Sequence, residues 1–352
     1  MNDRNQQLME WLQDIGLHSK SIAPASADAS FRQYFRVQTE SGSFIVMDAP
    51  PDKEDTAPFI RIAQRFRQIG LNVPEVLEQD PVKGFLLLSD LGQQTYLGLL
   101  NAASVEELYG DAMGALMVLQ TGSYSDPDFL PQYDRPLLLA EMSLFRDWLL
   151  QKHLGLNLDD QQIHDLESSF EFLVNNALEQ PPVWVHRDYH SRNLMRTDEH
   201  NPGILDFQDA VLGPVTYDLV SLLKDCYIDW PREQVENWVK GYQKLSLESG
   251  LQVTKDEKEY LRWFDLMGAQ RHLKAAGIFA RLYHRDGKAV SPTRSSVASR
   301  AGLASDRRRE LDGPAGASSS LPSLSSPGLR RWYDSDGGDL GIASGAGCSA
   351  QS

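Results

Sequence analysis

Residues 183–195 read VWVHRDYHSRNLM, and the segment HRDYHSRN at 186–193 decides how the rest of the chain is interpreted. This segment matches the catalytic-loop pattern H-R-D-x-x-x-x-N, with the same five-residue step from Asp188 to Asn193. A carboxylate at the place of Asp188 accepts the proton of an attacking hydroxyl. An amide oxygen at the place of Asn193 is a ligand that suits Mg²⁺. We therefore predict Asp188 as a catalytic base and Asn193 as a metal ligand.

A second acidic segment follows along the chain. Residues 204–210 read ILDFQDA, so that Asp206 ends an apolar run, where the second magnesium ligand of a kinase belongs. Phosphoryl transfer requires a carboxylate near the attacking hydroxyl and a divalent metal that bridges the phosphates. Asp188, Asn193 and Asp206 together predict an enzyme that uses ATP and Mg²⁺. Asp and Asn are also common turn residues, but that alternative does not account for the joint spacing.

Three further side chains near these motifs receive secondary roles. His186 is interpreted as a structural residue of the loop, because Asp188 already fills the role of base. Asp209 is either a further metal contact or an ordinary loop acid, and Asp218 either braces the catalytic loop or caps the next helix.

The order of apolar patterns predicts the fold class. Helical spacing predicts helices at 5–16 and 57–69, and β-branched and aromatic runs predict strands at 31–37, 43–47, 75–79 and 84–88. Further along, the predicted helices are 104–120, 136–153, 160–178, 215–228, 232–245 and 255–283, with short strands at 183–185 and 203–207. We therefore predict an α+β, protein-kinase-like, two-lobed fold with a small antiparallel β-rich N-lobe and a larger, mostly α-helical C-lobe.

The length and the composition of the chain predict its domains. At 352 residues it is too long for a single core. We expect a nucleotide-binding N-lobe at 1–92 and a catalytic and acceptor-binding C-lobe at 93–288. After Lys288 the sequence becomes rich in Ser, Gly, Ala, Arg and Pro, so 289–352 is predicted to be largely disordered. This tail is either a natural variant or the product of a reading-frame shift.

The segment ASFRQYFR at 29–36 stands where a kinase carries its phosphate-covering loop, although it lacks the glycines of G-x-G-x-x-G. Ser30 is predicted to cover the β- and γ-phosphates and Arg32 to contact them, the alternative being a solvated strand edge. The strand at 43–47 has no lysine where V-A-I-K would place one. The contact to the α- and β-phosphates is therefore unassigned.

The segment LLLSDLG at 86–92 ends a predicted strand and leads into the helical region. Such a segment is typical of a hinge whose backbone reads the edge of the adenine base, with apolar walls around it. Ser89, Asp90 and Leu91 are therefore predicted to bind the nucleotide, unless the segment is a plain linker.

Composition and charge restrict the cellular compartment and the kinds of partner that fit this chain. The formal net charge is −15 at pH 7 and the basic residues are mostly dispersed, which argues against nucleic acid as a partner. No apolar run reaches a membrane-spanning length and the polar start is unlike a signal peptide, so no membrane association is expected. The cysteines Cys226 and Cys348 are far apart, and Cys226 is predicted to be buried. A reducing, cytoplasmic location fits these features.

With these motifs in hand, the chain resembles the aminoglycoside phosphotransferase and choline kinase superfamily over residues 5–288. The resemblance rests on ASFRQYFR at 29–36, VMDAPP at 46–51, the segment at 184–195 and DFQDA at 206–210. Two further segments, GPVTYDL at 213–219 and GAQRHLK at 268–274, look like those of the bacterial anomeric kinases of N-acetylmuramate and N-acetylglucosamine. The departure comes after Lys288, since that family continues with helical structure.

The resemblance implies an activity. It implies phosphorylation of an amino sugar at C1 with ATP, giving a sugar 1-phosphate in peptidoglycan recycling. Arg271, His272 and Lys274 would then pair with the lactyl carboxylate of N-acetylmuramate, the alternative being an ordinary charged helix face. A kinase of the same superfamily that acts on an aminoglycoside, choline or another small alcohol is a second hypothesis. A pseudokinase is a third, favoured by the absent lysine and disfavoured by the retained Asp188.

Overall fold

The computed structural model describes residues 3–27 and 31–286. Ser30, one of the predicted phosphate contacts, lies outside the described residues, and so does the tail at 289–352. The predictions for these two parts of the chain therefore stay predictions.

The chain forms two compact units. The first runs from the N-terminus to Pro131 and includes Trp184–Val211, and the second consists of Gln132–Val183 and the residues from Leu212 on. The chain passes from one unit to the other after Pro131 and again within two short strands, β6 (Pro182–Val185) and β9 (Val211–Pro214). The first unit therefore contains the predicted nucleotide-binding residues and both catalytic segments.

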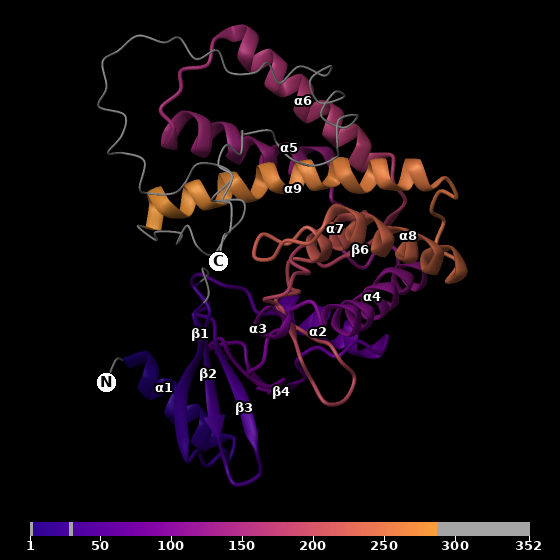
Figure 1. The fold of residues 1–352 in the computed structure, drawn as a ribbon. Coiled ribbons are helices and arrows are strands. Elements are labelled where there is room, and N and C mark those ends of the chain that lie inside the picture. Colours follow the sequence, from indigo (N-terminus) through magenta and orange to yellow (C-terminus); the bar gives the residue numbers. More distant parts are fainter. Residues whose placement is uncertain (1–2, 28–30, 287–352) are drawn as a thin grey trace, which may run out of the picture. The chain divides into compact units, whose positions relative to one another are not determined.

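A five-stranded antiparallel sheet with the strand order β1-β2-β3-β5-β4 dominates the first unit (Figure 1). Its strands are β1 (Ser21–Ala27), β2 (Gln33–Gln38), β3 (Ser43–Asp48), β4 (Val76–Asp80) and β5 (Phe85–Ser89). β1 was not predicted, because its sequence SIAPASA consists mainly of small residues and a proline, and the alternation that identifies strands is missing.

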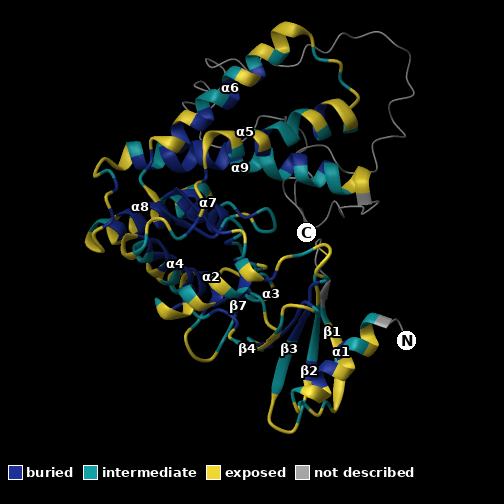
Figure 2. Ribbon diagram, turned by 180° about the vertical axis from the view of Figure 1, so that it is seen from behind, coloured by how far each residue is buried: buried dark blue, intermediate teal, exposed yellow. Residues whose placement is uncertain are grey.

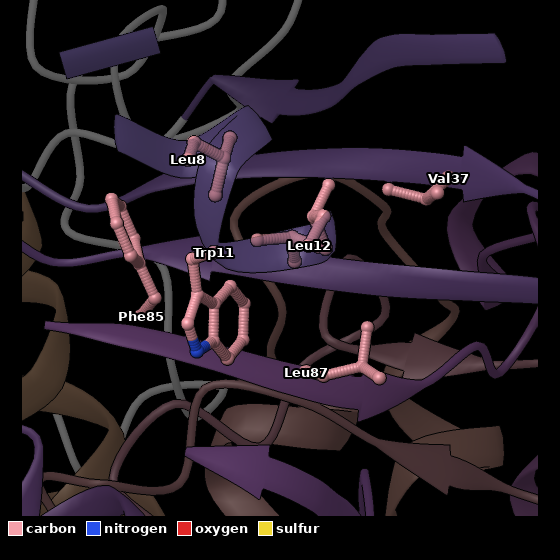
Figure 3. Close-up of a cluster of buried hydrophobic side chains, with 7 residues drawn as sticks. Leu8, Trp11, Leu12, Val37, Phe85 and Leu87 are labelled. Carbon is pink, nitrogen blue, oxygen red and sulfur yellow. The ribbon is translucent and has the colours of Figure 1, made fainter. Parts of the chain in front are cut away.

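One face of this sheet packs against helix α1 (Asp3–Asp14). Figure 3 shows Leu8, Trp11 and Leu12 of α1 beside the strand residues Val37, Phe85 and Leu87. The rings of Trp11 and Phe85 have their centroids 5.5 Å apart. Because a fully buried side chain of this size contributes about 1.5–3 kcal/mol, this cluster is sufficient to hold α1 on the sheet.

The other elements of the first unit surround the catalytic segments. They are α2 (Ala57–Gln68), α3 (Tyr96–Leu99), α4 (Val105–Gly122), the 3₁₀ turn η1 (Ser123–Ser125) and the hairpin strands β7 (Leu194–Met195) and β8 (Gly203–Ile204). Phe59 and Phe66 of α2 lie 4.9 and 5.9 Å from the ring of Phe207. The amphipathic helix α2 thereby anchors the segment that carries Asp206.

The second unit is helical. It contains α5 (Arg135–Leu144), η2 (Phe145–His153), α6 (Asp160–Leu178), α7 (Tyr217–Leu223), α8 (Arg232–Glu248) and α9 (Glu257–Asp286). The long helix α9, orange in Figure 1, packs against all the others. All seven residues of α7 are buried, and the helix is dark blue in Figure 2. Caps fix two helix starts: Asp134 accepts from the backbone N–H of Leu137, and Asp159 forms a capping box with Gln162.

Several predicted elements differ from those observed. The helix predicted at 136–153 is α5 followed by the π-helical turns of η2, a change that hydrophobic spacing does not reveal. The helix predicted at 215–228 ends already at Leu223, as α7. The strand predicted at 203–207 is only the two residues of β8. Cys226 is half-buried, so the prediction that it is buried was wrong.

The sequence predicts a nucleotide-binding lobe at 1–92 and a catalytic and acceptor-binding lobe at 93–288. These functional assignments stay predictions. The compact units divide the chain differently, because residues 93–131 and 184–211 belong with the N-terminal residues. Within the described part of the chain, no helix is both long and apolar enough to span a membrane.

Candidate active site

The hairpin of β7 and β8 brings the two catalytic segments together. Leu194 pairs with Ile204 in antiparallel register, and the backbone N–H of Leu205 donates to the carbonyl of Asn193 at 2.9 Å. Asn193 directly precedes β7 and Asp206 follows β8 by two residues. The pairing of the strands therefore places the two predicted metal ligands side by side.

The side-chain amide of Asn193 joins all three predicted catalytic residues. Its Nδ2 donates to the backbone carbonyl of Asp188 at 3.0 Å and lies 3.3 Å from Oδ2 of Asp206. The carbonyl of Asp188 and Oδ2 of Asp206 can only accept hydrogen bonds. The amide atom of Asn193 that faces them is therefore the nitrogen. The oxygen Oδ1 is then the amide atom suited to a hard cation.

The carboxylate of Asp206 is held from a second side by Gln208. The Nε2 of Gln208 donates to Oδ1 of Asp206 at 2.7 Å. Asp206 has a positive φ of 65°, a left-handed conformation that residues other than glycine rarely adopt. The following residue, Phe207, is completely buried against α2. Backbone strain of this kind clusters at functional sites, where the surrounding packing maintains it.

The backbone of Asp188 is fixed by its neighbours. Its N–H donates to Nδ1 of His186 at 3.2 Å, and its C=O accepts from Asn193. His186 is completely buried, and this burial lowers the pKa of its imidazole to about 4, so the ring is neutral near pH 7 and its Nδ1 accepts. His186 thus has the structural place that the sequence predicts. The hydroxyl of Tyr189 donates to the carbonyl of Ala112 at 2.8 Å and ties the loop to α4.

The predicted hinge residues lie at the end of β5. The carboxylate of Asp90 accepts from the guanidinium of Arg36 at 2.6 and 3.0 Å and from the hydroxyl of Ser43. Burial by itself raises the pKa of the Asp90 carboxyl, but these hydrogen bonds outweigh burial and lower the pKa below its usual value. The side chain of Asp90 therefore makes structural contacts, and the backbone N–H of Ser89 is bonded to the carbonyl of Glu75 at 3.0 Å.

Leu91 connects the hinge to the catalytic hairpin. A Cβ on Gly203 of β8 would lie 3.0 Å from Cδ1 of Leu91, so a larger residue would require this side chain to shift and glycine favours the close approach. The side chain of Leu91 is half-buried. An apolar side chain at this place is suited to one wall of a base-binding site.

Arg32, the predicted phosphate contact, directly precedes β2. Its Nε lies 3.5 Å from Oε2 of Glu54, and 12% of its side chain is exposed. The position at which the strand lysine is missing holds Met47, which is completely buried. The acid next to it, Asp48, pairs with Arg4 of α1.

The predicted acceptor-binding residues lie on α9 in the second unit. The guanidinium of Arg271 stands 5.1 Å from the centre of the Tyr217 ring, and His272 is half-buried. Lys274 instead is paired: its Nζ lies 2.9 Å from Oε1 of Glu141 and 3.0 Å from the hydroxyl of Tyr217. A substrate carboxylate would have to compete with Glu141 for this ammonium group.

Glu141 belongs to a buried polar cluster with Tyr133, Tyr217 and Gln270. The hydroxyl of Tyr133 donates to the carboxylate of Glu141, and burial raises the pKa of Tyr133 well above its ordinary value. The sequence patterns do not identify Glu141, Glu54 or Gln208. The available signal for Glu141 was an acid at a core position of an otherwise apolar helical pattern.

The arrangement of Asp206 and Asn193 fits a magnesium ion. Among the described residues there is no group of three or more His, Cys, Asp or Glu side chains close enough to enclose a metal. Mg²⁺ does not need such a group, because it keeps several waters and shares its remaining positions with substrate phosphates. The carboxylate of Asp206 and the amide oxygen of Asn193 are donor types that Mg²⁺ accepts.

Curated kinases are similar in sequence to this chain. The curated N-acetylmuramate/N-acetylglucosamine kinase of Pseudomonas aeruginosa is 48% identical over 267 residues, which cover 76% of this chain and 78% of that protein. The kinase of the same name from Neisseria meningitidis serogroup B is 44% identical over 291 residues, which cover 81% of this chain and 86% of that protein.

Solved structures show the same fold at low identity. The GDP complex of aminoglycoside 2'-phosphotransferase-IIIa has a TM-score of 0.57 at 14% identity and covers 81% of this chain and 94% of that chain. Choline kinase from Streptococcus pneumoniae has a TM-score of 0.58 at 12% identity and covers 85% of this chain and 97% of that chain. The predicted α+β, protein-kinase-like fold is confirmed, and so is the prediction of a phosphoryl-transferring enzyme. Since residues 21–256 match the "Phosphotransferase enzyme family", the chain belongs to that family.

Proposed function

We propose that this chain is a Mg²⁺-dependent kinase that transfers the γ-phosphoryl group of ATP to the anomeric hydroxyl of N-acetylmuramate and N-acetylglucosamine. The observation that carries the proposal is the hydrogen-bonded set of Asp188, Asn193 and Asp206 in a chain 44–48% identical to curated relatives of that name. The products are sugar 1-phosphates of peptidoglycan recycling. Because the donor is ATP, the reaction belongs in the cytoplasm.

Asp188 acts as the general base. Its carboxylate accepts the proton of the anomeric hydroxyl while the hydroxyl oxygen attacks the γ-phosphorus and the bond to the β,γ-bridging oxygen breaks, so that ADP leaves. His186 and Asn193 hold the backbone of Asp188 at its N–H and its C=O. Such fixed positioning matters because a displacement of about 1 Å at the reacting atoms can slow a reaction by about 100-fold.

Asn193 and Asp206 would hold the magnesium ion through Oδ1 and the carboxylate. When bound, the ion neutralises charge on the phosphates. The contribution of the chain is to present these oxygens in a defined orientation, which Gln208 supports through its bond to Asp206. Ser30, Arg32 and the hinge residues Ser89, Asp90 and Leu91 remain the proposed nucleotide contacts.

For the acceptor, Arg271 and His272 remain the proposed partners of the lactyl carboxylate of N-acetylmuramate. The planar guanidinium of Arg271 is suited to bidentate binding of a carboxylate, and the ring of Tyr217 supports it. Lys274 is the weakest of the three proposed contacts, because Glu141 already neutralises its charge.

The proposal is tested with the purified chain, ATP and Mg²⁺, by measuring ATP consumption with N-acetylmuramate, N-acetylglucosamine, choline or kanamycin as acceptor. Phosphorus NMR then identifies the product. We expect turnover with both amino sugars and a phosphate on C1. Turnover with choline or kanamycin alone would exclude the proposed acceptor, and nucleotide binding without any turnover would favour a pseudokinase.

A further inference from the structure

Strand β3 contains no lysine, although protein kinases carry one on the corresponding strand. In the sheet register Met47 pairs with Tyr34, and Ile45 pairs with Arg36, so these four side chains share one face. The opposite face, with Val37 and Val46, is covered by α1. The position of the missing lysine thus belongs to the face that carries Tyr34 and Arg36 on the neighbouring strand, and a cation for the phosphates can come from that strand.

Of the two arginines near this face, Arg36 is already engaged. Its guanidinium donates to both carboxylate oxygens of Asp90 and, at 2.7 Å, to the backbone carbonyl of Gly92. These hydrogen bonds raise the pKa of Arg36 above its ordinary value. Arg36 therefore serves as a structural link between β2 and the segment after β5.

Arg32 is held differently. Its ion pair with Glu54 joins Nε to Oε2 at 3.5 Å, which is longer than the hydrogen bonds of Arg36. Glu54 also accepts from the backbone N–H of Phe31 at 3.3 Å, and the ammonium of Lys53 lies 4.8 Å from the ring of Phe31. Glu54 thereby fixes the chain at 31–32, where it enters β2.

We propose that Arg32 takes the place of the missing strand lysine and binds the α- and β-phosphates, with Glu54 as the residue that positions it. This inference rests on the proposed function. In protein kinases a strand lysine that contacts these phosphates pairs with a glutamate of a helix. Here the glutamate lies in the segment before α2 and pairs with an arginine, whose planar group binds phosphate oxygens in a bidentate manner.

The test measures nucleotide binding by calorimetry with adenosine, ADP and MgATP. Arg32→Met is expected to weaken ADP and MgATP binding by about 10- to 100-fold, the range of one or two charge-assisted hydrogen bonds, and to leave adenosine binding unchanged. Glu54→Gln is expected to show the same selective loss, but smaller. The matched control is Arg67→Met, because Arg67 forms an ion pair with Glu75 in the same unit at 3.0 Å.

The outcomes separate this inference from the proposed function. If Arg32→Met binds ADP as tightly as the wild type, the assignment of Arg32 is overturned. The assignment is also overturned if Arg32→Met loses as much affinity for adenosine as it does for ADP. If the methionine variant does not fold, Arg32→Lys decides: a several-fold loss for ADP alone supports the assignment, and no loss contradicts it. A wild-type chain that binds no nucleotide would overturn the proposed function itself.

Discussion

The amide nitrogen of Gln208 lies 2.7 Å from Oδ1 of Asp206 and donates a hydrogen bond to it. The other oxygen of this carboxylate faces the amide of Asn193. The amide oxygen of Gln208 is buried and has no hydrogen-bond partner among residues 3–27 and 31–286. A buried amide that leaves one of its atoms without a partner is costly, which indicates that the orientation of Gln208 serves the carboxylate of Asp206.

Gln208→Ala is expected to raise the Mg²⁺ concentration for half-maximal activity by about 10-fold, because it removes one hydrogen bond to a charged group. The measurement is a titration of activity with Mg²⁺ at saturating ATP. Gln161→Ala is the matched control, since Gln161 donates to Asp165 at 2.9 Å on the exposed face of α6. An unchanged Mg²⁺ dependence in Gln208→Ala would contradict a positioning role.

Asp188→Asn keeps the shape of the side chain and removes the base. Turnover should fall by about 10²- to 10⁴-fold, while the affinity for MgATP stays within a few-fold of the wild type. Steady-state kinetics with N-acetylglucosamine and calorimetry with MgATP measure the two effects. Asp198→Asn, at an exposed position between β7 and β8, should leave turnover nearly unchanged. Normal turnover of a folded Asp188→Asn variant would exclude Asp188 as the base.

The buried imidazole of His186 predicts a pH dependence of stability. Its pKa is lowered to about 4 by burial, whereas in the unfolded chain it is near the ordinary value of 6.5. Below pH 6.5 the unfolded state binds a proton that the native state does not, so the free energy of unfolding falls as the pH falls.

Between pH 6.5 and 5 the loss from His186 is expected to be about 2 kcal/mol. Urea unfolding at several pH values measures it as the difference between the wild type and His186→Gln. The exposed residue His164 provides the control, and His164→Gln should keep the wild-type slope. A slope in His186→Gln equal to that of the wild type would show that His186 does not cause the pH dependence.

The ion pair of Lys274 and Glu141 predicts an asymmetry between single and double substitutions. Lys274→Met leaves the carboxylate of Glu141 buried without its cation and should cost about 3–5 kcal/mol of unfolding free energy. Adding Glu141→Gln should recover a large part of this loss, because the uncompensated charge is then removed. Denaturant unfolding of both variants measures the difference.

Kinetics of the same variants tests the proposed acceptor contact. If Lys274 binds the lactyl carboxylate, the double variant should lose activity with N-acetylmuramate more than with N-acetylglucosamine, which lacks that group. An equal change with both sugars would assign Lys274 a purely structural role.

Asp188, Asn193 and Asp206, the proposed catalytic residues, are the part of the candidate site with the clearest sequence pattern. The spacing of Asp188 and Asn193 and the apolar run before Asp206 reflect local backbone geometry, so neighbouring residues are enough to identify them. The structure adds that a two-residue hairpin brings them together. Gln208 and Glu54 are not identified by the sequence pattern. A glutamine or a glutamate in a loop can have many roles, and only the residue that it contacts in the folded structure shows which role it has.

Strand β1 and the π-helical turns of η2 were missed for a related reason. Both depend on long-range packing, since β1 is stabilised by its pairing with β2 and η2 by its contact with α9. Intrinsic propensities are small beside such contacts, so a proline-containing strand forms where a neighbour supplies its hydrogen bonds. Hydrophobic periodicity alone does not carry this information.

The sequence by itself determined the fold class and the family, and it indicated Asp188, Asn193 and Asp206 as the proposed base and metal ligands, because these inferences follow from periodicity and from motifs within short segments. Only the tertiary structure decided the partners of each charge: Arg36 with Asp90, Arg32 with Glu54 and Lys274 with Glu141. The residues of these pairs stand 54, 22 and 133 positions apart in the chain. Their electrostatic energy depends on distance and burial in the folded state, and neither is encoded locally.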